Sequence, residues 1–93
     1  MVMELKWTSK ALSDLTRLYD FLVPVNKAGA VRTIQALSAA PTDLLINPRI
    51  GERLEEFEPR EVRRILAGHY EMRYEIQGST INVLRLWHTR EDR

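Results

Sequence analysis

The sequence predicts an α+β fold with the order β-α-α-β-β-β, in which a two-helix hairpin packs on a small antiparallel sheet. Two patterns lead to this prediction. In the first half of the chain, apolar residues recur at intervals of three and four, which is typical of amphipathic helices. Over residues 70–76, apolar and charged residues alternate, which is typical of a strand with one buried face. Ninety-three residues suffice for one core, so we expect a single domain over residues 1–93.

The composition is that of an ordinary globular protein. Hydrophobic residues make up 44% of the chain and charged residues 29%. No apolar run approaches the roughly 18 residues of a membrane helix, and the N-terminal residues lack the layout of a signal peptide. The chain has no cysteine, which excludes disulfides and thiolate chemistry. We therefore expect a cytoplasmic protein that does not bind membranes.

The first predicted strand spans residues 3–7, where apolar and charged residues alternate. Thr8 or Ser9 then caps a helix, which Pro24 ends. Polar residues of this helix, Asp14 among them, lie between the apolar positions and so outside the apolar stripe. That stripe consists of Ala11, Leu12, Leu15, Leu18, Tyr19 and Leu22.

Asn26 caps the second predicted helix, and Asn47 with Pro48 ends the helical region. Pro41 interrupts it. Because a proline inside a helix costs about 3 kcal/mol, we expect a kink or a fresh first turn there. A short turn joins the two helices, which makes them an αα-hairpin. The apolar stripe of the second helix consists of Ala30, Val31, Ile34 and Leu37 and resumes at Leu44 and Leu45.

Residues 48–61 are the least regular part, and a brief strand over residues 53–57 fits them as well as a loop does. Three strands follow, and a Gly-containing turn at residues 77–79 joins the last two. The last strand, residues 80–88, is apolar at nearly every position, which indicates an inner strand with both faces covered. The two helices are expected to cover the sheet face formed by Tyr70, Met72, Tyr74 and Ile76.

The usual catalytic and cofactor motifs are absent from the sequence. It contains no Gly-rich phosphate loop, no H-E-x-x-H and no G-x-S-x-G. Nothing in the pattern places a third metal ligand beside His69 and His88, so solvated or hydrogen-bonded histidines are favoured over a metal site. We therefore expect neither a metal nor a cofactor.

The net charge of +1 does not by itself indicate a nucleic-acid partner, but all seven basic residues after position 58 are arginines. Arginine suits phosphate recognition, so a phosphate-binding group with a histidine acid is one interpretation. The other is that these charges flank the sheet and pair with Glu71, Glu75, Glu91 and Asp92, and spacing alone favours it. The residues concerned are Arg60, Arg63, Arg64, Arg73, Arg85, His88 and Arg90.

The sequence alone does not decide which face of the sheet Arg63 and Arg64 take or whether Trp87 is in the core. If Val62, Arg64 and Leu66 share one face of their strand, Arg63 lies on the opposite face. Trp87 can stack on a base, as aromatic side chains do on nucleic-acid platforms. A tryptophan on an inner strand is more often part of the core, and this second interpretation of Trp87 is favoured.

Three segments resemble a known family: PRIGERL at 48–54, VRRILAGHYEMRYEI at 62–76 and INVLRLWHTREDR at 81–93. With the preceding strand and helices, they make the chain similar to the RelE/ParE superfamily of bacterial toxins from type II toxin–antitoxin modules. The resemblance implies the fold predicted above and a cognate antitoxin whose disordered segment wraps the toxin. It also allows a toxin dimer or a heterotetramer with the antitoxin.

The superfamily divides into two activities. RelE-like members are ribosome-dependent endoribonucleases that cut mRNA with basic residues of the sheet and a Tyr or His near the C-terminus, whereas ParE-like members lack that set and inhibit DNA gyrase. Arg64 and Arg90 match the nuclease pattern, and His88 can serve as the acid. Glu71, however, stands where RelE-like enzymes place an arginine, and a carboxylate repels the scissile phosphate. The chain also stops at Arg93, before a terminal tyrosine.

The resemblance therefore favours a ParE-like toxin of a plasmid stabilisation module, which arrests growth by inhibiting DNA gyrase and is neutralised by its antitoxin. The alternative is a RelE-like enzyme that acts on mRNA at the ribosome, with Arg64, His88 and Arg90 as catalytic residues. A second alternative is a degenerate toxin that only binds its antitoxin, so whether the chain is an enzyme stays open. The residues expected to bind the target are Arg63, Arg73, Arg85, His88 and Arg90.

Overall fold

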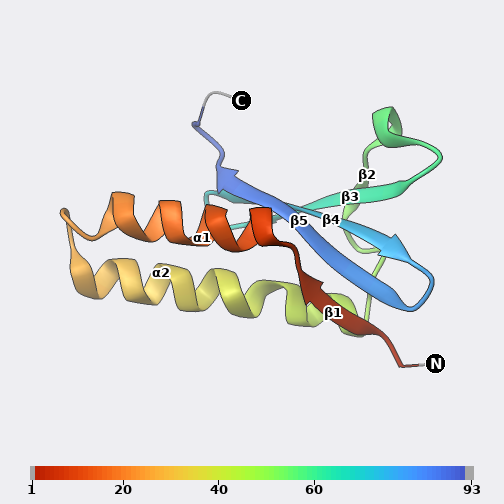
Figure 1. Cartoon of the computed structure of the whole chain (residues 1–93), viewed down its shortest axis with the longest axis horizontal. Coiled ribbons are helices and arrows are strands. Elements are labelled where there is room, and N and C mark those ends of the chain that lie inside the picture. The colour runs from red at the N-terminus through yellow and green to blue at the C-terminus, as the bar shows by residue number, and fades with distance from the viewer. Residues whose placement is uncertain (1, 92–93) are drawn as a thin grey trace.

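The computed structural model describes residues 2–91 and has two helices packed on one side of a sheet (Figure 1). Within these residues the sheet has five strands in the order β1-β5-β4-β3-β2. The predicted fold is confirmed, and the short strand β2 is an addition to the predicted order. The elements are β1 (Glu4–Trp7), α1 (Ser9–Leu22), α2 (Lys27–Ala39), η1 (Ala40–Leu45), β2 (Glu52–Arg53), η2 (Glu55–Phe57), β3 (Glu61–Ala67), β4 (Tyr70–Gln77) and β5 (Thr80–His88).

The first helix, α1, begins where the sequence predicts. Thr8 is its N-cap, and the Thr8 hydroxyl accepts a hydrogen bond from the Ala11 N–H at 3.2 Å. The same hydroxyl donates to the Val83 carbonyl of β5 at 2.9 Å. The cap therefore starts the helix and also ties it to the sheet. α1 ends at Leu22, shortly before Pro24, which has no N–H to extend the helical hydrogen bonds.

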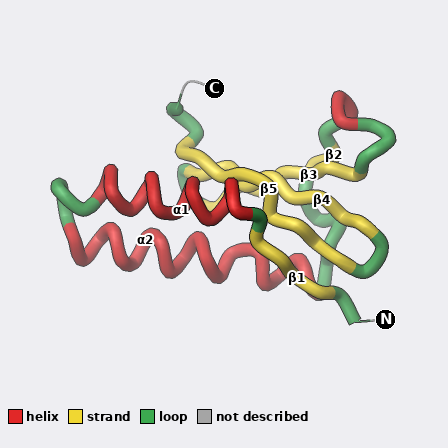
Figure 2. The backbone as a smooth tube through the Cα atoms, in the orientation of Figure 1, coloured by secondary structure: helices red, strands yellow, loops and turns green. Residues whose placement is uncertain are grey.

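The second helix, α2, is also capped as predicted, because the Asn26 side chain accepts from the Gly29 N–H at 3.0 Å. The interruption at Pro41 is confirmed: α2 ends at Ala39, and Pro41 lies in the first turn of the 3-10 helix η1, where its missing N–H needs no partner. Figure 2 shows the two helices side by side, projecting past the end of the sheet. None of the helices within residues 2–91 is long and apolar enough to cross a membrane.

The strand β4 lies in the middle of the sheet, antiparallel to β3 on one side and to β5 on the other. Gly68 and Gly78 in the connecting turns have φ angles of +62° and +59°, which glycine adopts without strain. β1 pairs with β5 in parallel, so the first and last strands lie side by side. The brief strand considered over residues 53–57 is limited to β2, which ends at Arg53.

The core lies between the helical hairpin and the sheet. Met72, Tyr74 and Ile76 of β4 are buried there, and Tyr70 packs against the same cluster at its edge. This confirms that the helices cover the predicted face of the sheet. The helical side of the core consists of Ala11, Leu18, Leu37 and Leu44.

One polar residue of α1 departs from its predicted place. Asp14, expected outside the apolar stripe, is only 4% exposed and faces β5. The register between β4 and β5 shifts between Arg73 and Tyr74, which leaves Leu84 as an extra residue, a β-bulge. Arg85, which follows the bulge, donates to Asp14 Oδ2 at 2.8 Å. Asp14 is therefore buried against β5 because Arg85 and the Leu86 N–H both donate to its carboxylate.

Candidate functional site

The residues predicted to form the site fall into three groups in the structure. The first lies on the open face, which is the face of the sheet away from the helices. The second consists of two arginines whose side chains are each bound to a neighbouring element. The third lies at the end of β5, beside α1. The groups are Arg64 with Arg73, Arg63 with Arg85, and His88 with Arg90.

Glu71 is the centre of the charges on the open face. Its carboxylate accepts from Arg64 Nη1 at 3.1 Å and from Arg73 Nε at 3.2 Å. Arg64 Nε also donates to Glu52 at 2.6 Å. Glu71 is 8% exposed, so it is held among these arginines and away from solvent. The expected pairing of the arginines with Glu71 is therefore confirmed.

A second ion pair lies beside this one on the open face. Arg60 donates to both carboxylate oxygens of Glu75, at 2.9 and 3.0 Å. This hydrogen bonding lowers the pKa of Glu75 against the opposing effect of burial. The pairing expected for Glu75 is thus confirmed as well. Of the two other expected acidic partners, Glu91 instead binds Arg17 of α1, and Asp92 lies outside the described residues.

Trp87 is buried, as predicted, but it lies on the open face and not in the core beneath the helices. Its neighbour Leu86 faces the helices, and successive strand residues point to opposite faces. The Arg73 guanidinium lies 4.7 Å from the centroid of Trp87 and 5.6 Å from that of Phe57. Arg73 therefore covers the ring that the alternative interpretation required for stacking on a base.

Arg63 lies on the opposite face from Arg64, as strand alternation predicts. Its guanidinium donates to the carbonyl of Gly51 at 2.8 Å, to that of Arg49 at 3.3 Å and to Glu61 at 2.9 Å. These bonds hold the loop before β2 against β3. The side chain is 15% exposed, so its role in the described structure is to fix that loop.

Arg85 is likewise engaged within the chain. It donates to both oxygens of Asp14, at 2.8 and 3.2 Å, and the Leu86 N–H donates to the same carboxylate at 2.9 Å. Burial raises the pKa of Asp14, but the hydrogen bonds from Arg85 and Leu86 outweigh it, so the net pKa lies below its usual value. Asp14 is therefore a charged anchor that joins α1 to β5.

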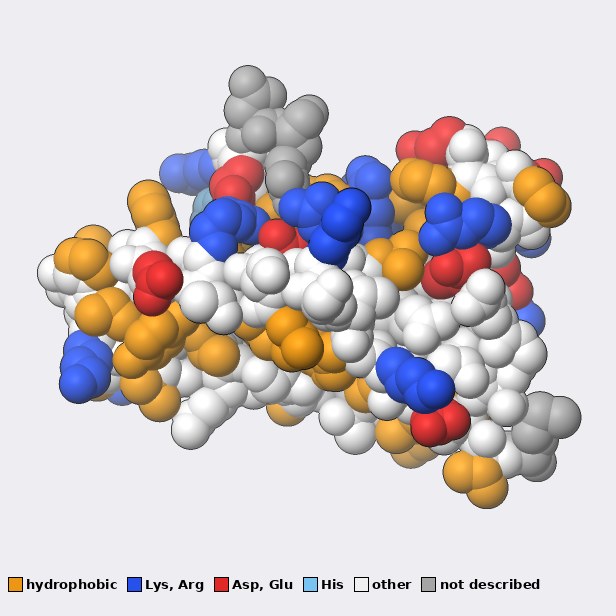
Figure 3. Space-filling view, viewed as in Figure 1, with side chains coloured by type: hydrophobic (Ala, Val, Ile, Leu, Met, Phe, Trp, Pro, Cys, Tyr) orange, Lys and Arg blue, Asp and Glu red, His pale blue; other side chains and the backbone are white. Residues whose placement is uncertain are grey.

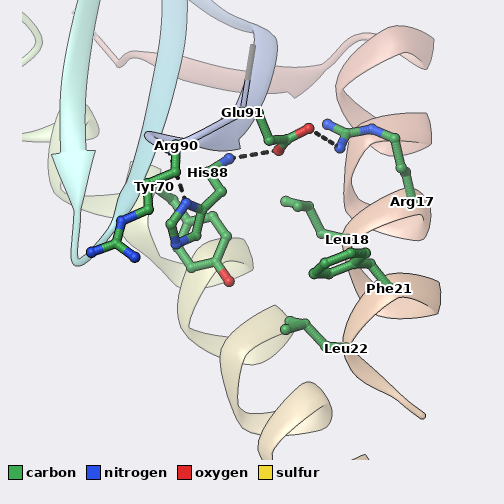
Figure 4. Close-up of a pocket in the computed structure, with 8 residues that line it drawn as sticks. All are labelled: Arg17, Leu18, Phe21, Leu22, Tyr70, His88, Arg90 and Glu91. Atoms are coloured by element: carbon green, nitrogen blue, oxygen red, sulfur yellow. Dashed lines mark hydrogen bonds and ion pairs between the residues drawn. The ribbon is translucent and has the colours of Figure 1, made fainter. Parts of the chain in front are cut away.

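A pocket of about 550 Å³ opens between the second half of α1 and the end of β5 (Figure 4). Its volume is within the range of ligand-binding pockets, about 300–1,000 Å³. One wall is the apolar face of α1, and the other carries aromatic and charged side chains. Within residues 2–91, no three side chains of His, Cys, Asp or Glu are placed to hold a metal ion. The pocket is lined by Arg17, Leu18, Phe21, Leu22, Tyr70, His88, Arg90 and Glu91.

The aromatic wall of the pocket is ordered by contacts around His88. The His88 ring meets Tyr70 edge to face at 5.1 Å between centroids and stacks with His69 at 6.0 Å. His88 Nδ1 accepts from the Arg90 N–H at 3.1 Å, so the neutral ring carries its proton on Nε2. Burial, and then the charge of Glu91, raise the pKa of Tyr70. The phenol therefore keeps its proton at neutral pH and can donate a hydrogen bond.

Glu91 joins the two walls of the pocket. One carboxylate oxygen accepts from the His88 N–H at 2.8 Å, and the other accepts from the Arg17 guanidinium (Figure 4). The Glu91 N–H in turn donates to the His88 carbonyl at 2.9 Å. The residues after β5 thus form a tight turn whose carboxylate reaches across to α1.

The three residues considered for nuclease chemistry do not share one surface. Arg64 projects from the open face, where it binds Glu71. His88 pairs in register with Tyr70, which packs in the core cluster on the helical side. Arg64 and His88 therefore lie on opposite faces of the sheet, and only Arg90 lies near His88.

The sequence prediction missed the helical wall of the pocket. Phe21 stands outside the predicted apolar stripe although it is large and apolar, and this mismatch is the signal that could have identified it. It is 75% exposed in the structure. Arg17 and Glu91 are 74 residues apart in the sequence, and no local rule predicts their contact.

Comparison with known proteins identifies the chain. Residues 5–93 match the family described as the ParE toxin of the type II toxin–antitoxin system parDE. The chain belongs to this ParE toxin family. The match spans nearly the whole sequence and confirms the resemblance to the RelE/ParE superfamily. A comparison with curated proteins gives no match.

Solved structures share the fold of this ParE-family toxin. A chain of the chromosomal ParDE system from P. aeruginosa has a TM-score of 0.80 and 26% identity, over 94% of this chain and 96% of that chain. A chain of the toxin–antitoxin complex RelBE2 from Mycobacterium tuberculosis has a TM-score of 0.67 and 25% identity, over 95% and 99%. A doubly substituted RelE toxin from E. coli in the free state, at 15% identity and a TM-score of 0.63 over 97% and 86%, shows the fold alone.

Proposed function

We propose that this ParE-family toxin arrests growth by inhibiting DNA gyrase and that a cognate antitoxin neutralises it. On this proposal, residues 1–93 form one toxin domain that acts in the cytoplasm and needs no cofactor. The family match supports a ParE-like toxin. The observation that favours gyrase inhibition over mRNA cleavage is the position of Glu71, whose carboxylate binds both Arg64 and Arg73.

The Glu71 cluster opposes phosphate binding for an electrostatic reason. A phosphate that approached Arg64 or Arg73 would meet the negative charge of Glu71 at the same place. If the arginines left Glu71 to bind that phosphate, a buried carboxylate would remain without its partners, which is strongly unfavourable. The position of His88 on the other face removes the acid from the same surface. Both features favour a toxin without nuclease chemistry.

The residues proposed to contact the target differ in how free they are to do so. The Arg90 side chain is exposed and has no ion pair within residues 2–91, and His88 lies beside it at the pocket. The other three are bound to partners in the chain, so binding to the target would first have to displace those partners. We therefore place most of the target contact at the end of β5. The proposed residues are Arg63, Arg73, Arg85, His88 and Arg90.

The antitoxin is proposed from two kinds of support. The P. aeruginosa relative comes from a ParDE system, and the M. tuberculosis relative was solved as a toxin–antitoxin complex. This chain also exposes apolar surface beside its pocket, which a partner can bury. Co-expression with the small gene next to the toxin gene should raise the yield of folded toxin. An unchanged yield and melting temperature would contradict the proposed partner.

A supercoiling assay tests the proposed target directly. The purified toxin, added to gyrase and relaxed plasmid, should inhibit supercoiling and trap complexes that contain cleaved DNA. Pre-mixing with the antitoxin should restore supercoiling. Unaffected gyrase in a strain whose growth the toxin arrests would contradict the gyrase target. Unaffected growth on overexpression would leave only the degenerate module that binds an antitoxin.

The RelE-like nuclease remains the second candidate because of one contact. Tyr70 and His88 meet edge to face at the pocket wall, and the raised pKa of Tyr70 keeps its phenol protonated. The similarity to a chain of a RelBE2 complex is in keeping with this alternative. Mapping of mRNA ends on translating ribosomes tests it. Cleavage that His88→Ala and Arg90→Ala abolish would establish the nuclease and refute the gyrase proposal.

A further inference from the structure

The Glu91 carboxylate occupies a small anion site at the mouth of the pocket. The site consists of the Arg17 guanidinium on α1 and the His88 N–H at the end of β5. The donors come from a helix and a strand, whereas Glu91 comes from the turn that follows the last strand. The Glu91 side chain is 30% exposed and that of Arg17 is 41% exposed. The ion pair is therefore open to solvent and to exchange.

Apolar surface begins directly beside this anion site. Leu18, Phe21 and Leu22 stand at positions i, i+3 and i+4 of α1, so they lie on one side of the helix, and Val25 follows in the turn after it. Phe21 and Val25 are 75% and 84% exposed. In the space-filling view, hydrophobic side chains gather at this end of the hairpin (Figure 3). Such spacing suits the apolar side chains of an amphipathic partner segment laid in the groove.

We propose that this site is a carboxylate exchange site: Glu91 occupies it in the free toxin, and an acidic side chain of an antitoxin segment replaces Glu91 in the complex. The same segment places its apolar side chains against Leu18, Phe21 and Leu22. This inference rests on the proposed function for the identity of the partner. It adds the chemistry that the partner needs, which is a carboxylate next to apolar residues at helical spacing.

Charge explains why the partner must be acidic. The two basic side chains that line the pocket are Arg17 and Arg90, and the one acidic side chain that lines it is Glu91. Replacement of Glu91 by a partner carboxylate keeps a negative charge on Arg17 and a hydrogen bond on the His88 N–H. A basic segment would repel Arg17 and Arg90, and a neutral one would leave Arg17 paired with Glu91. The exchange also releases the turn after β5 from α1.

Two synthetic peptides test the proposal. Both are amphipathic, with leucine at helical spacing; one has glutamate at its polar positions and the other has glutamine. The glutamate peptide should bind the wild-type toxin about tenfold more tightly, the order of effect expected for a charge-assisted hydrogen bond. Glu91→Gln should strengthen binding of the glutamate peptide about tenfold again, because the competing carboxylate is gone, and should leave the glutamine peptide unaffected.

The matched control is Glu56→Gln, which changes the net charge by the same amount at an exposed glutamate of η2. It should leave the affinity for both peptides unchanged. Arg17→Gln should abolish the difference between the peptides, and Phe21→Ala should weaken both of them equally. Fluorescence anisotropy gives the affinities, and thermal melting verifies that each variant is folded. Glu91 and Phe21 are outside the core, so their variants should fold. The test therefore remains possible even if Arg17→Gln does not fold.

Three results would overturn the proposal: equal binding of the two peptides to the wild-type toxin, equal gains for Glu91→Gln and Glu56→Gln, or no binding of either peptide. Peptide binding does not require toxicity, so the two proposals can fail separately. A toxin that inhibits gyrase but shows no exchange refutes only this inference. A chain that shows the exchange but neither arrests growth nor inhibits gyrase refutes only the proposed function.

Discussion

The open face of the sheet and the pocket beside α1 both contain arginines, but the arginines differ in what they can still bind. On the open face, Arg64 and Arg73 share the buried carboxylate of Glu71. At the pocket, Arg17 holds the partly exposed Glu91, and Arg90 has no ion pair within residues 2–91. The number of basic residues therefore does not identify a binding surface. The burial of their acidic partners decides which surface is available.

The contrast extends to the apolar residues. On the open face, Arg73 covers Trp87, so the large aromatic side chain is hidden under a charge. At the pocket, Phe21 projects into solvent beside a core residue, Leu18, one turn earlier on the same helix. A buried polar cluster and an exposed apolar groove thus lie on opposite sides of one sheet. We expect the first to contribute to stability and the second to binding.

The largest expected difference is between two substitutions on α1. Leu18→Ala should lower the free energy of unfolding by about 3 kcal/mol, because Leu18 is buried and the substitution leaves a cavity in the core. Phe21→Ala should change it by less than about 0.5 kcal/mol, because the ring is mostly in solvent. Urea denaturation measures both. Equal losses would mean that Phe21 is part of the fold and would end the distinction between core and pocket.

Asp14→Asn should lower the free energy of unfolding by about 2 kcal/mol, because it leaves Arg85 with a weaker partner. The partial exposure of Arg85 keeps the loss below that of a fully buried pair. Since the pKa of Asp14 is lowered on folding, its contribution is complete above the unfolded-state pKa of about 3.9 and is lost as the pH falls below it. The wild-type advantage over Asp14→Asn should therefore shrink below about pH 4. A pH-independent difference would show that charge is not the cause.

Glu71→Gln should lower the free energy of unfolding by about 1 kcal/mol and release Arg64 and Arg73 from their carboxylate. The freed arginines should strengthen binding to single-stranded RNA and make that binding more sensitive to salt. Fluorescence anisotropy at several salt concentrations measures this gain. Glu56→Gln is the control for net charge. If both variants bind RNA alike, Glu71 is not what keeps the open face from binding phosphate.

Arg90→Ala, like Phe21→Ala, should change the free energy of unfolding by no more than about 0.5 kcal/mol, because the side chain is exposed and only its backbone N–H bonds to His88. Its effect on growth arrest should nevertheless be large, since Arg90 is the proposed target contact that no ion pair restrains within residues 2–91. Colony counts after induction measure it. Unchanged toxicity at equal expression would remove Arg90 from the target surface.

Local signals in the sequence were enough to predict the elements of the fold. Thr8 and Asn26 cap the helices through their own side chains, and Pro41 ends α2 through its missing N–H. Each effect acts within a few residues, so a sequence window contains its cause. The alternation over residues 70–76 predicted the buried face of β4 for the same reason.

The candidate site could be predicted only in part, because its contacts join distant residues. Arg85 was identifiable as an unusual charge in an apolar strand, but its partner Asp14 lies 71 residues away on α1, and no local pattern joins the two. The position of Glu71 was informative in the sequence, while its double ion pair depends on the register of three strands. His88 was proposed as a site residue without the helical wall that faces it.

The parallel pairing of β1 with β5 has a consequence for how the chain folds during its synthesis. β1 is synthesised first, and its backbone hydrogen bonds to the sheet form only after β5 has been synthesised. Pairing between segments so distant in sequence is slow compared with local folding. A chain cut short before residue 80 would lack β5, and with it the pairing to β1 and the His88, Arg90 and Glu91 side of the pocket. A nascent chain therefore cannot form the pocket until β5 and the turn after it have been synthesised.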